Sequence, residues 1–422
     1  MNSETIDSLV WQLNFGLKSE VNRAFKEIWK LGEENGVFPA SINDFYMAKG
    51  KEKLPLNFTV PAMNLRGASY DMARAVFKTA KAKKVGALIL ELARTEMSYT
   101  DQPPKKYAGT MIAAALREGF KGFLFIQGDH FQVKKGDKAA TPKKGEVNSL
   151  KKVIKESIEA GFYNIDLDIS TLVDYSKKKV SEQQKKNFTM AAKLTEYIRS
   201  IEPKGVTVSL GGEIGHIGGK NSTEEELRAY MEGYNKALKK GLVGLSKIAI
   251  QTGTHHGGVP LPDGTLADVA VDFSCLKKLA QVSREYGMGG TVQHGASTLP
   301  DEYFAQFTKA EAIEVHLATG FQNIMMDHPK FPKSLLKKMY QWIDEEFKDE
   351  KKKDQTNEQF HYKLRKKAWG QFKKECWQLS EDIRSALRKD LEKRFAFMYQ
   401  ELNVENTKKM VRKWIKVVRV RK

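Results

Sequence analysis

Eight short apolar segments alternate with segments of helical periodicity between residues 58 and 317. Apolar runs of this length predict buried strands, and strict alternation with helices is typical of a (β/α)8 TIM barrel. A doubly wound parallel sheet is the alternative, but no Gly-x-Gly-x-x-Gly follows the first segment, which argues against a dinucleotide-binding fold. The predicted strands are 58–63, 86–92, 123–126, 164–168, 206–210, 248–251, 291–293 and 313–317.

Polar side chains follow several of these predicted strands. The third strand ends in Gly128-Asp129-His130, and His256 and His294 follow the sixth and seventh strands. In a barrel all strand ends meet on one face, so these residues should converge. Three imidazoles with room for a fourth ligand are typical of a catalytic zinc site. The alternative is that each histidine only ends a strand.

The composition argues against a membrane-spanning protein and against a secreted, disulfide-stabilised one. Hydrophobic residues make up 41% of the 422 residues, and no apolar run approaches the roughly 20 residues that span a bilayer. The first residues lack the basic and apolar regions of a signal peptide. Cys275 and Cys376 are the only cysteines, so we expect no disulfide framework and a cytoplasmic location.

The chain divides into three predicted parts. Residues 1–50 show helical spacing and should cap residues 51–330, which form the barrel. Residues 331–422 carry 26 Lys and Arg against 14 Asp and Glu, with aromatic residues at helical intervals. We therefore expect a basic helical C-terminal extension. Its charge favours solvated helix faces over nucleic-acid binding, which would be an added function.

Seven motifs follow one another along the chain. They are Pro61-Ala-Met-Asn64, Gly128-Asp-His130, Asn164-Ile-Asp-Leu-Asp-Ile-Ser170, Gly212-Glu-Ile-Gly-His-Ile-Gly-Gly219, Thr254-His-His-Gly257, His294-Gly-Ala-Ser297 and His316-Leu-Ala-Thr319. In this order they resemble the motifs of class II, zinc-dependent fructose-bisphosphate aldolases. The resemblance extends from Val60 to His328, about two thirds of the chain, and the order of the motifs makes it specific.

The resemblance implies roles for individual residues. His130, His256 and His294 would bind zinc, with Glu213 as a nearby alternative ligand. Zinc would polarise the ketone and stabilise the enediolate, while Asp129 would move the proton of the hydroxyl that becomes the aldehyde oxygen. The residues expected to contact the substrate or its phosphate are Asn64, Gly257, Gly258, Gly295, Ser297 and Thr319.

The implied reaction is cleavage or condensation of a ketose bisphosphate. Fructose 1,6-bisphosphate, giving dihydroxyacetone phosphate and glyceraldehyde 3-phosphate, is the leading substrate, which would place the enzyme in glycolysis. A tagatose-bisphosphate or other sugar-phosphate aldolase is the enzymatic alternative, and a catalytically silent accessory subunit is the other. We expect a homodimer or homotetramer that binds no membrane, and a requirement for a monovalent cation stays open.

The sequence also departs from the family pattern. His316 and Ala318 replace an asparagine and an aspartate, and Ala93 occupies the place of a phosphate-binding serine. Lys220 and Asn221 follow the Gly-Gly motif, where some members carry the glutamate that abstracts the carbon-bound proton. A different substrate pocket could be built from Arg94, Glu96 and Tyr99.

Overall fold

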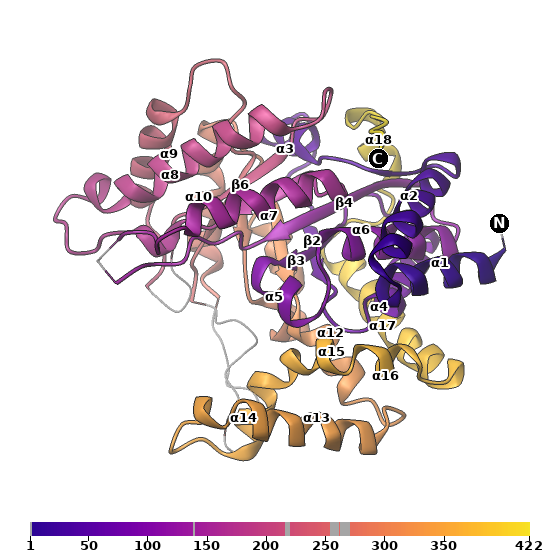
Figure 1. Ribbon diagram of the computed structural model, residues 1–422. Helices are drawn as coiled ribbons and strands as arrows, with labels where there is room; N and C mark the ends of the chain where they lie inside the picture. The colour runs from indigo at the N-terminus through magenta and orange to yellow at the C-terminus, as the bar shows by residue number, and fades with distance from the viewer. Residues whose placement is uncertain (1, 138–139, 216–219, 254–260, 262–270) are drawn as a thin grey trace.

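The computed structural model describes residues 2–137, 140–215, 220–253, 261 and 271–422 (Figure 1). Its eight central strands are parallel, each pairs with its neighbours along the chain, and the last pairs with the first, so the barrel closes. The fold is the predicted (β/α)8 barrel, with all eight predicted strands. The barrel strands are β2 (Val60–Asn64), β3 (Ile89–Ala93), β4 (Gly122–Asp129), β5 (Asn164–Leu167), β6 (Ser209–Glu213), β7 (Lys247–Ile250), β8 (Thr291–Gln293) and β9 (Glu314–Leu317).

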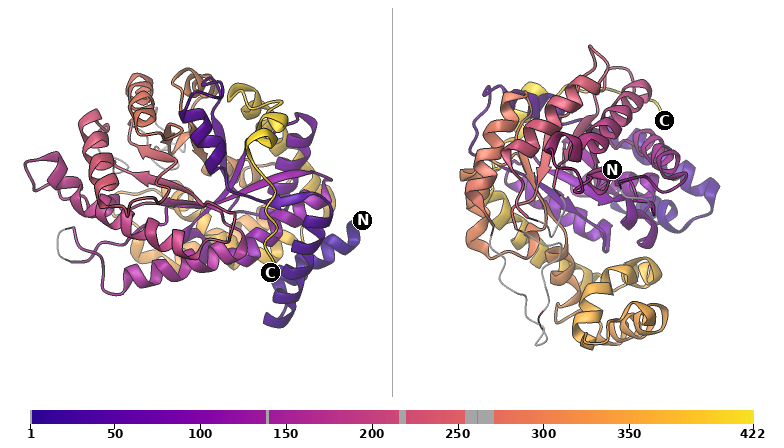
Figure 2. Two further views of the ribbon diagram at one scale, coloured as in Figure 1. Left: turned by 90° about the horizontal axis from the view of Figure 1, so that it is seen from above. Right: turned by 90° about the vertical axis from the view of Figure 1, so that its left-hand side faces the viewer.

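Helices surround these strands (Figure 2). Their ends follow local signals in the sequence: Thr223 caps one helix by accepting from the Glu226 N–H at 3.1 Å, and the Glu226 carboxylate accepts from the Thr223 N–H at 2.8 Å. This reciprocal pair is a capping box, a common start of a helix. The helices around the barrel are α4 (Ser69–Ala82), α5 (Arg94–Tyr99), α6 (Pro104–Arg117), α7 (Glu146–Ala160), α8 (Val180–Ile201), α9 (Glu224–Ala237), α10 (Phe273–Glu285), α11 (Phe304–Lys309) and α12 (Thr319–Met326).

The N-terminal part contains a strand that the helical spacing did not predict. Between α2 (Lys18–Glu34) and α3 (Asn43–Gly50), β1 (Val37–Pro39) pairs in parallel with the first residues of β4. The Asn164 amide then accepts from the Ile42 N–H at 2.9 Å and joins this segment to β5. Three residues are too few to show a two-residue period, so this strand has no clear sequence signal. The remaining helix is α1 (Ser3–Phe15).

Strand β6 begins and ends three residues later than predicted. Its last residues are Gly211, Gly212 and Glu213, which interrupt the apolar pattern although they are buried. A Cβ atom on Gly211 would lie 2.3 Å from Oδ1 of Asp166. Glycine at this position therefore makes room for a charged side chain inside the barrel.

From Lys333 onward the elements are all helical, as the aromatic spacing predicted. Helix α17 packs along α4 and α12 on the barrel, while α13 and α14 lie beyond α12, at the end of the barrel where the strands terminate (Figures 1 and 2). No helix among the described residues is long and apolar enough to cross a membrane. These helices are α13 (Lys333–Glu346), α14 (Asn357–Leu364), α15 (Ala368–Gln371), α16 (Lys373–Trp377), α17 (Glu381–Glu401) and α18 (Lys408–Trp414).

Candidate active site

The end of β4 delivers two adjacent side chains into one site. The strand extends through Asp129, three residues beyond the predicted end at Ile126, and His130 follows with a φ of 41°. Neighbouring residues on a strand point to opposite faces, so the left-handed turn at His130 is what brings its ring beside Asp129. Gly128 permits this turn, because a Cβ there would lie 2.4 Å from the ring of Phe131.

Asp129, His130 and His294 form a cluster that fits a divalent metal ion. One ligand atom from each lies within 4.8 Å of the others, and the two imidazole centroids are 4.4 Å apart. The Nδ1 of His130 lies 3.1 Å from Oδ2 of Asp168, and its Nε2 lies 3.9 Å from Oδ1 of Asp129. A carboxylate behind a histidine orients the other nitrogen toward a metal. The predicted third histidine, His256, lies outside the described residues.

Glu213, the predicted alternative ligand, lies on the other side of the His130 ring. Its Oε2 is 3.4 Å from Nδ1 of His130, and it forms a second potential ligand group with His130 and Asp168. Burial raises the pKa of Glu213 to about 8, and the nearby Asp168 carboxylate adds to the rise. A proton or a cation at this position therefore relieves repulsion between two buried carboxylates.

The electrostatics of Asp129 and His130 are those of a buried ion pair. Burial alone would raise the pKa of Asp129, but His130 and His316 hold that pKa well below its usual value. Burial likewise would lower the pKa of His130, yet Asp129 and Glu213 raise it well above the usual value. The cationic rings thus occupy, electrostatically, the position that a metal ion would take.

A second group of charged residues fills the barrel interior below this cluster, and the sequence analysis missed most of it. The Lys247 ammonium lies 2.5 Å from Glu314, 2.7 Å from the Gln127 amide oxygen and 2.9 Å from Asp166. His316 Nε2 lies 2.6 Å from Oε1 of Glu314. Lys247 and Glu314 are fully buried. The available signal in the sequence was the two-residue spacing of Glu314 and His316, which places both side chains on the same face of a strand.

At the mouth of the barrel, Asn64 belongs to a buried network rather than standing alone. Its amide donates to Oε2 of Glu96 at 2.5 Å, and Arg66 donates to Oε1 of Glu96 at 2.8 Å and to the Thr319 hydroxyl at 2.9 Å. Burial lowers the pKa of Arg66, but Glu96 more than offsets it. The cation beside Thr319 was not predicted, although Arg66 lies two residues beyond the Pro61–Asn64 motif.

Of the other residues proposed to build a different pocket, Tyr99 joins this network and Arg94 does not. The Tyr99 hydroxyl donates to Oε1 of Glu96 at 3.3 Å. Arg94 instead donates to the Gln132 carbonyl at 2.9 Å and pairs with Glu146 at the start of α7. Arg94 therefore anchors a loop to a helix.

The residues predicted to bind phosphate lie together where they are described. The Gly320 N–H donates to the Ser297 hydroxyl at 3.2 Å, which joins the N-terminus of α12 to the turn after β8. Gly295 begins that turn with a φ of 72°, a conformation that glycine adopts without strain. A helix N-terminus, two hydroxyls and the Arg66 cation suit an anion. Gly257 and Gly258 lie outside the described residues.

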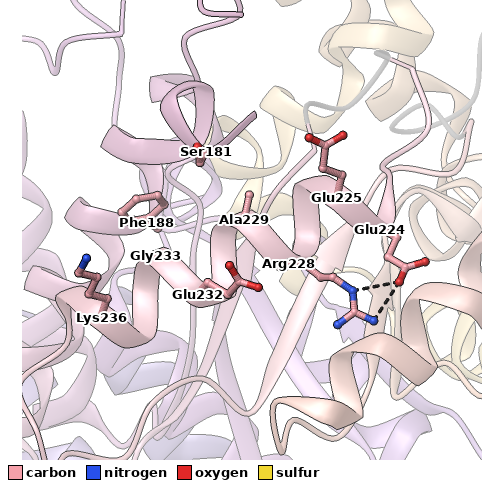
Figure 3. A pocket seen from close by; sticks show the side chains of 9 residues that line it. All are labelled: Ser181, Phe188, Glu224, Glu225, Arg228, Ala229, Glu232, Gly233 and Lys236. Carbon is pink, nitrogen blue, oxygen red and sulfur yellow. Dashed lines mark hydrogen bonds and ion pairs between the residues drawn. The ribbon is translucent and has the colours of Figure 1, made fainter. Parts of the chain in front are cut away.

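A separate surface groove of about 600 Å³ lies between α8 and α9, outside the barrel (Figure 3). It is lined by charged residues of the α9 surface, including Glu224 and Arg228, whose side chains pair at 2.9 Å. None of the candidate metal or phosphate residues that the structure describes lines this groove.

Comparison with known families agrees with this geometry. The sequence matches the model of the family "Fructose-bisphosphate aldolase class-II" over residues 55–417. The chain belongs to the class II fructose-bisphosphate aldolase family. A search of curated proteins found no match.

Three solved structures show the same fold at low sequence identity. Fructose-bisphosphate aldolase from Campylobacter jejuni is 16% identical, with a TM-score of 0.51 over 88% of this chain and 97% of that one. The YdjI aldolase from Escherichia coli K12 is 12% identical, with a TM-score of 0.50 over 87% and 99%. The fructuronate-tagaturonate epimerase UxaE from Cohnella laeviribosi is 12% identical, with a TM-score of 0.56 over 82% of each chain.

Proposed function

We propose that this protein is a zinc-dependent aldolase that cleaves or forms a ketose bisphosphate, with fructose 1,6-bisphosphate as the leading substrate. The observation that carries the proposal is the meeting of Asp129, His130 and His294 at the strand ends. The hydroxyls of Ser297 and Thr319 and the Arg66 guanidinium, which would bind an anion, lie at the same end of the barrel. Metal ligands beside a phosphate site are what a sugar-phosphate aldolase needs.

Each residue would have a distinct task in this reaction. His130, His294 and His256 would hold zinc, which as a Lewis acid would polarise the ketone and stabilise the enediolate. Asp129 would take the proton from the substrate hydroxyl in the cleavage direction and return it in the synthesis direction.

The mouth of the barrel would hold the two ends of the substrate. The α12 N-terminus, the Ser297 hydroxyl and the Thr319 hydroxyl would bind one phosphate, and Arg66 would supply a cation. The Asn64 amide would contact a substrate hydroxyl, in exchange for part of its bond to Glu96. Because Glu96 and Arg66 are buried and paired, they would position these groups rather than move a proton.

Two alternatives stay open for the same site. Tagatose bisphosphate differs from the fructose compound at one hydroxyl-bearing carbon, so its discrimination would fall to residues such as Asn64 and Glu96. A catalytically silent accessory subunit is the second, motivated by the replacement of the family aspartate by Ala318. A silent subunit has no need to keep the metal-binding cluster.

The deciding experiment combines metal analysis with a coupled assay on fructose and tagatose bisphosphates. The purified protein should contain zinc, and His294→Ala should lose the zinc of the first cluster together with activity. A chelator should abolish turnover and leave the barrel folded, because its core does not depend on the ion. Zinc retained in full by His294→Ala would refute the ligand set, and activity on neither sugar would favour the silent subunit.

Asp129→Ala tests the proton-transfer role separately. General acid–base groups contribute about 10²–10⁴-fold, so turnover should fall within that range while the zinc on the histidines stays bound. Solvent exchange of the carbon-bound proton of dihydroxyacetone phosphate should survive better than carbon–carbon cleavage, since it needs a different base. Asn64→Ala serves as the comparison, because losing a substrate contact should raise KM more than it lowers kcat.

The location, assembly and division of the chain are proposed independently of the site. The protein would work in the cytoplasm as a homodimer or homotetramer, in three parts at residues 1–50, 51–330 and 331–422. Nucleic-acid binding through the basic C-terminal part is not favoured. Filter binding at low and high salt tests it, because phosphate contacts weaken steeply as salt rises.

A further inference from the structure

The C-terminal helical extension reaches the mouth of the barrel beside Arg66. Helix α15 of this extension packs on α5 (Figure 1). Gly370 permits the close approach, because a Cβ there would clash with the Tyr99 carbonyl oxygen. The Trp369 ring meets the backbone next to Arg66, where a Cβ on Gly67 would lie 3.1 Å from the ring. A helix far along the chain therefore packs against the segment that carries the Arg66 cation.

A chain of hydrogen bonds links Trp369 to the guanidinium of Arg66 through Gln322. The indole N–H of Trp369 donates to Oε1 of Gln322 at 3.2 Å, and Nε of Arg66 donates to the same oxygen at 3.2 Å. All three side chains are buried. An indole and a guanidinium only donate, so the Gln322 amide must turn its oxygen, not its NH2 group, toward both. Trp369 thus fixes the amide that holds Arg66.

Arg66 is held on three sides and still has N–H groups for a substrate. Its two terminal nitrogens donate to Glu96 at 2.8 Å and to the Thr319 hydroxyl at 2.9 Å. A guanidinium has five N–H groups, so two of them have no acceptor among the described residues. Because the guanidinium binds a phosphate through its planar fork, its orientation matters as well as its charge.

We propose that Trp369 is a positioning residue, which through Gln322 holds Arg66 in the orientation that binds the anionic end of the substrate. The inference rests on the proposed anion-binding role of Arg66 and goes beyond it, because it makes the C-terminal extension part of the substrate site. Trp369 acts through Gln322 and does not touch the substrate. The extension therefore contributes through a neutral indole rather than through its basic side chains.

Phosphate binding tests this link without relying on turnover. Inorganic phosphate is titrated into the full-length protein in a calorimeter at constant ionic strength, and the part of the binding that Arg66→Met loses defines this site. Trp369→Phe keeps an aromatic ring and removes the N–H, so binding at the site should weaken about 2- to 10-fold, the effect of one hydrogen bond. Gln322→Leu should weaken binding further, because Arg66 then loses its own hydrogen bond as well.

Trp377→Phe is the matched control. Trp377 lies in the same extension, on α16, and is also buried, but its indole N–H has no acceptor among the described residues. The same chemical change should therefore leave phosphate binding as it is. In an Arg66→Met background, Trp369→Phe should not weaken the remaining binding further, since the two residues act through one link. A general loss of packing would weaken it in both backgrounds.

The results that would overturn the inference differ from those that would overturn the proposed function. Wild-type phosphate binding in both Trp369→Phe and Gln322→Leu, with binding lost in Arg66→Met, would refute the link alone. An equal loss in Trp377→Phe would refute it too. Undiminished binding in Arg66→Met would refute the anion-binding role of Arg66 and the link with it. Circular dichroism identifies a variant that does not fold, and the other variant of the link then decides.

Discussion

The barrel interior and helix α17 are both rich in charged residues, but they hold that charge in opposite ways. In the interior, the side chains of Lys247 and Glu314 are 0% exposed and meet at 2.5 Å. On α17, Lys393 is 72% exposed and pairs with Asp390 at 2.7 Å in water. The attraction within a buried ion pair roughly equals the hydration energy that both groups lose on burial, whereas an exposed pair keeps most of its hydration. Charge inside the barrel therefore points to function, and charge on α17 to solvation.

Helix α17 has one charged, exposed face and one apolar, buried face. Beneath its charged surface, α17 buries apolar side chains against α4 and α12, and the rings of Phe395 and Phe321 lie 5.0 Å apart. The basic composition of the C-terminal part thus hides a face that completes the barrel's outer packing. The buried apolar residues of α17 are Leu387, Leu391, Phe395, Met398 and Tyr399.

Removing this face should have the largest effect. A chain ending at Pro332 would expose the apolar surfaces of α4 and α12, and we expect it to aggregate or to dissociate from its assembly. A chain ending at Ile415 keeps α17 and is the control that should stay folded. Light scattering and gel filtration give the readout. If the shorter chain stays monodisperse, in its native assembly and active, the C-terminal helices are an appendage.

Lys247→Met tests the interior side of the comparison. The change removes the ammonium but leaves the Asp166 and Glu314 carboxylates buried, which should lower the free energy of unfolding by about 3–5 kcal/mol. Urea unfolding monitored by circular dichroism measures it. Adding Glu314→Gln should recover part of the loss, because one of the stranded charges is then gone. A single variant as stable as the wild type would mean that water already reaches this network.

The barrel could be predicted from the sequence because its outward strand faces are apolar and regularly spaced. The inward faces could not be read the same way, since Glu91, Lys247 and Glu314 each interrupt an apolar run with one charge. Those charges become informative only when closure brings them together. His130 and His294 were predicted as strand ends that converge, and they lie together. The place of Arg66 in the site was not predicted, because its partner Glu96 is thirty residues away in the sequence.

Lys49 should make the free energy of unfolding depend on pH, because it is a second buried lysine. It is buried near Phe58 at the opposite end of the barrel, and burial lowers its pKa from 10.5 to about 7. Between these values the unfolded chain binds more protons than the folded one, so Lys49 makes folding more favourable as pH rises. The stability of wild type relative to Lys49→Met should therefore increase by about 2 kcal/mol from pH 7 to pH 9. A difference that stays constant in urea unfolding at the two pH values would show that Lys49 is solvated.

The smallest effect is expected on the exposed face of α17. Lys393→Met removes a pair with Asp390 three residues earlier on the same helix, and such pairs contribute about 0.2–0.5 kcal/mol. The remaining Asp390 carboxylate keeps its water and still lies 3.3 Å from His328, so nothing is left buried and unpaired. Urea unfolding at low and high salt should show a change below about 0.5 kcal/mol that shrinks as salt rises. A loss comparable with that of Lys247→Met would mean that the exposed face of α17 is covered in the assembled protein. The contrast between the two lysines would then reflect an interface between subunits, rather than solvent.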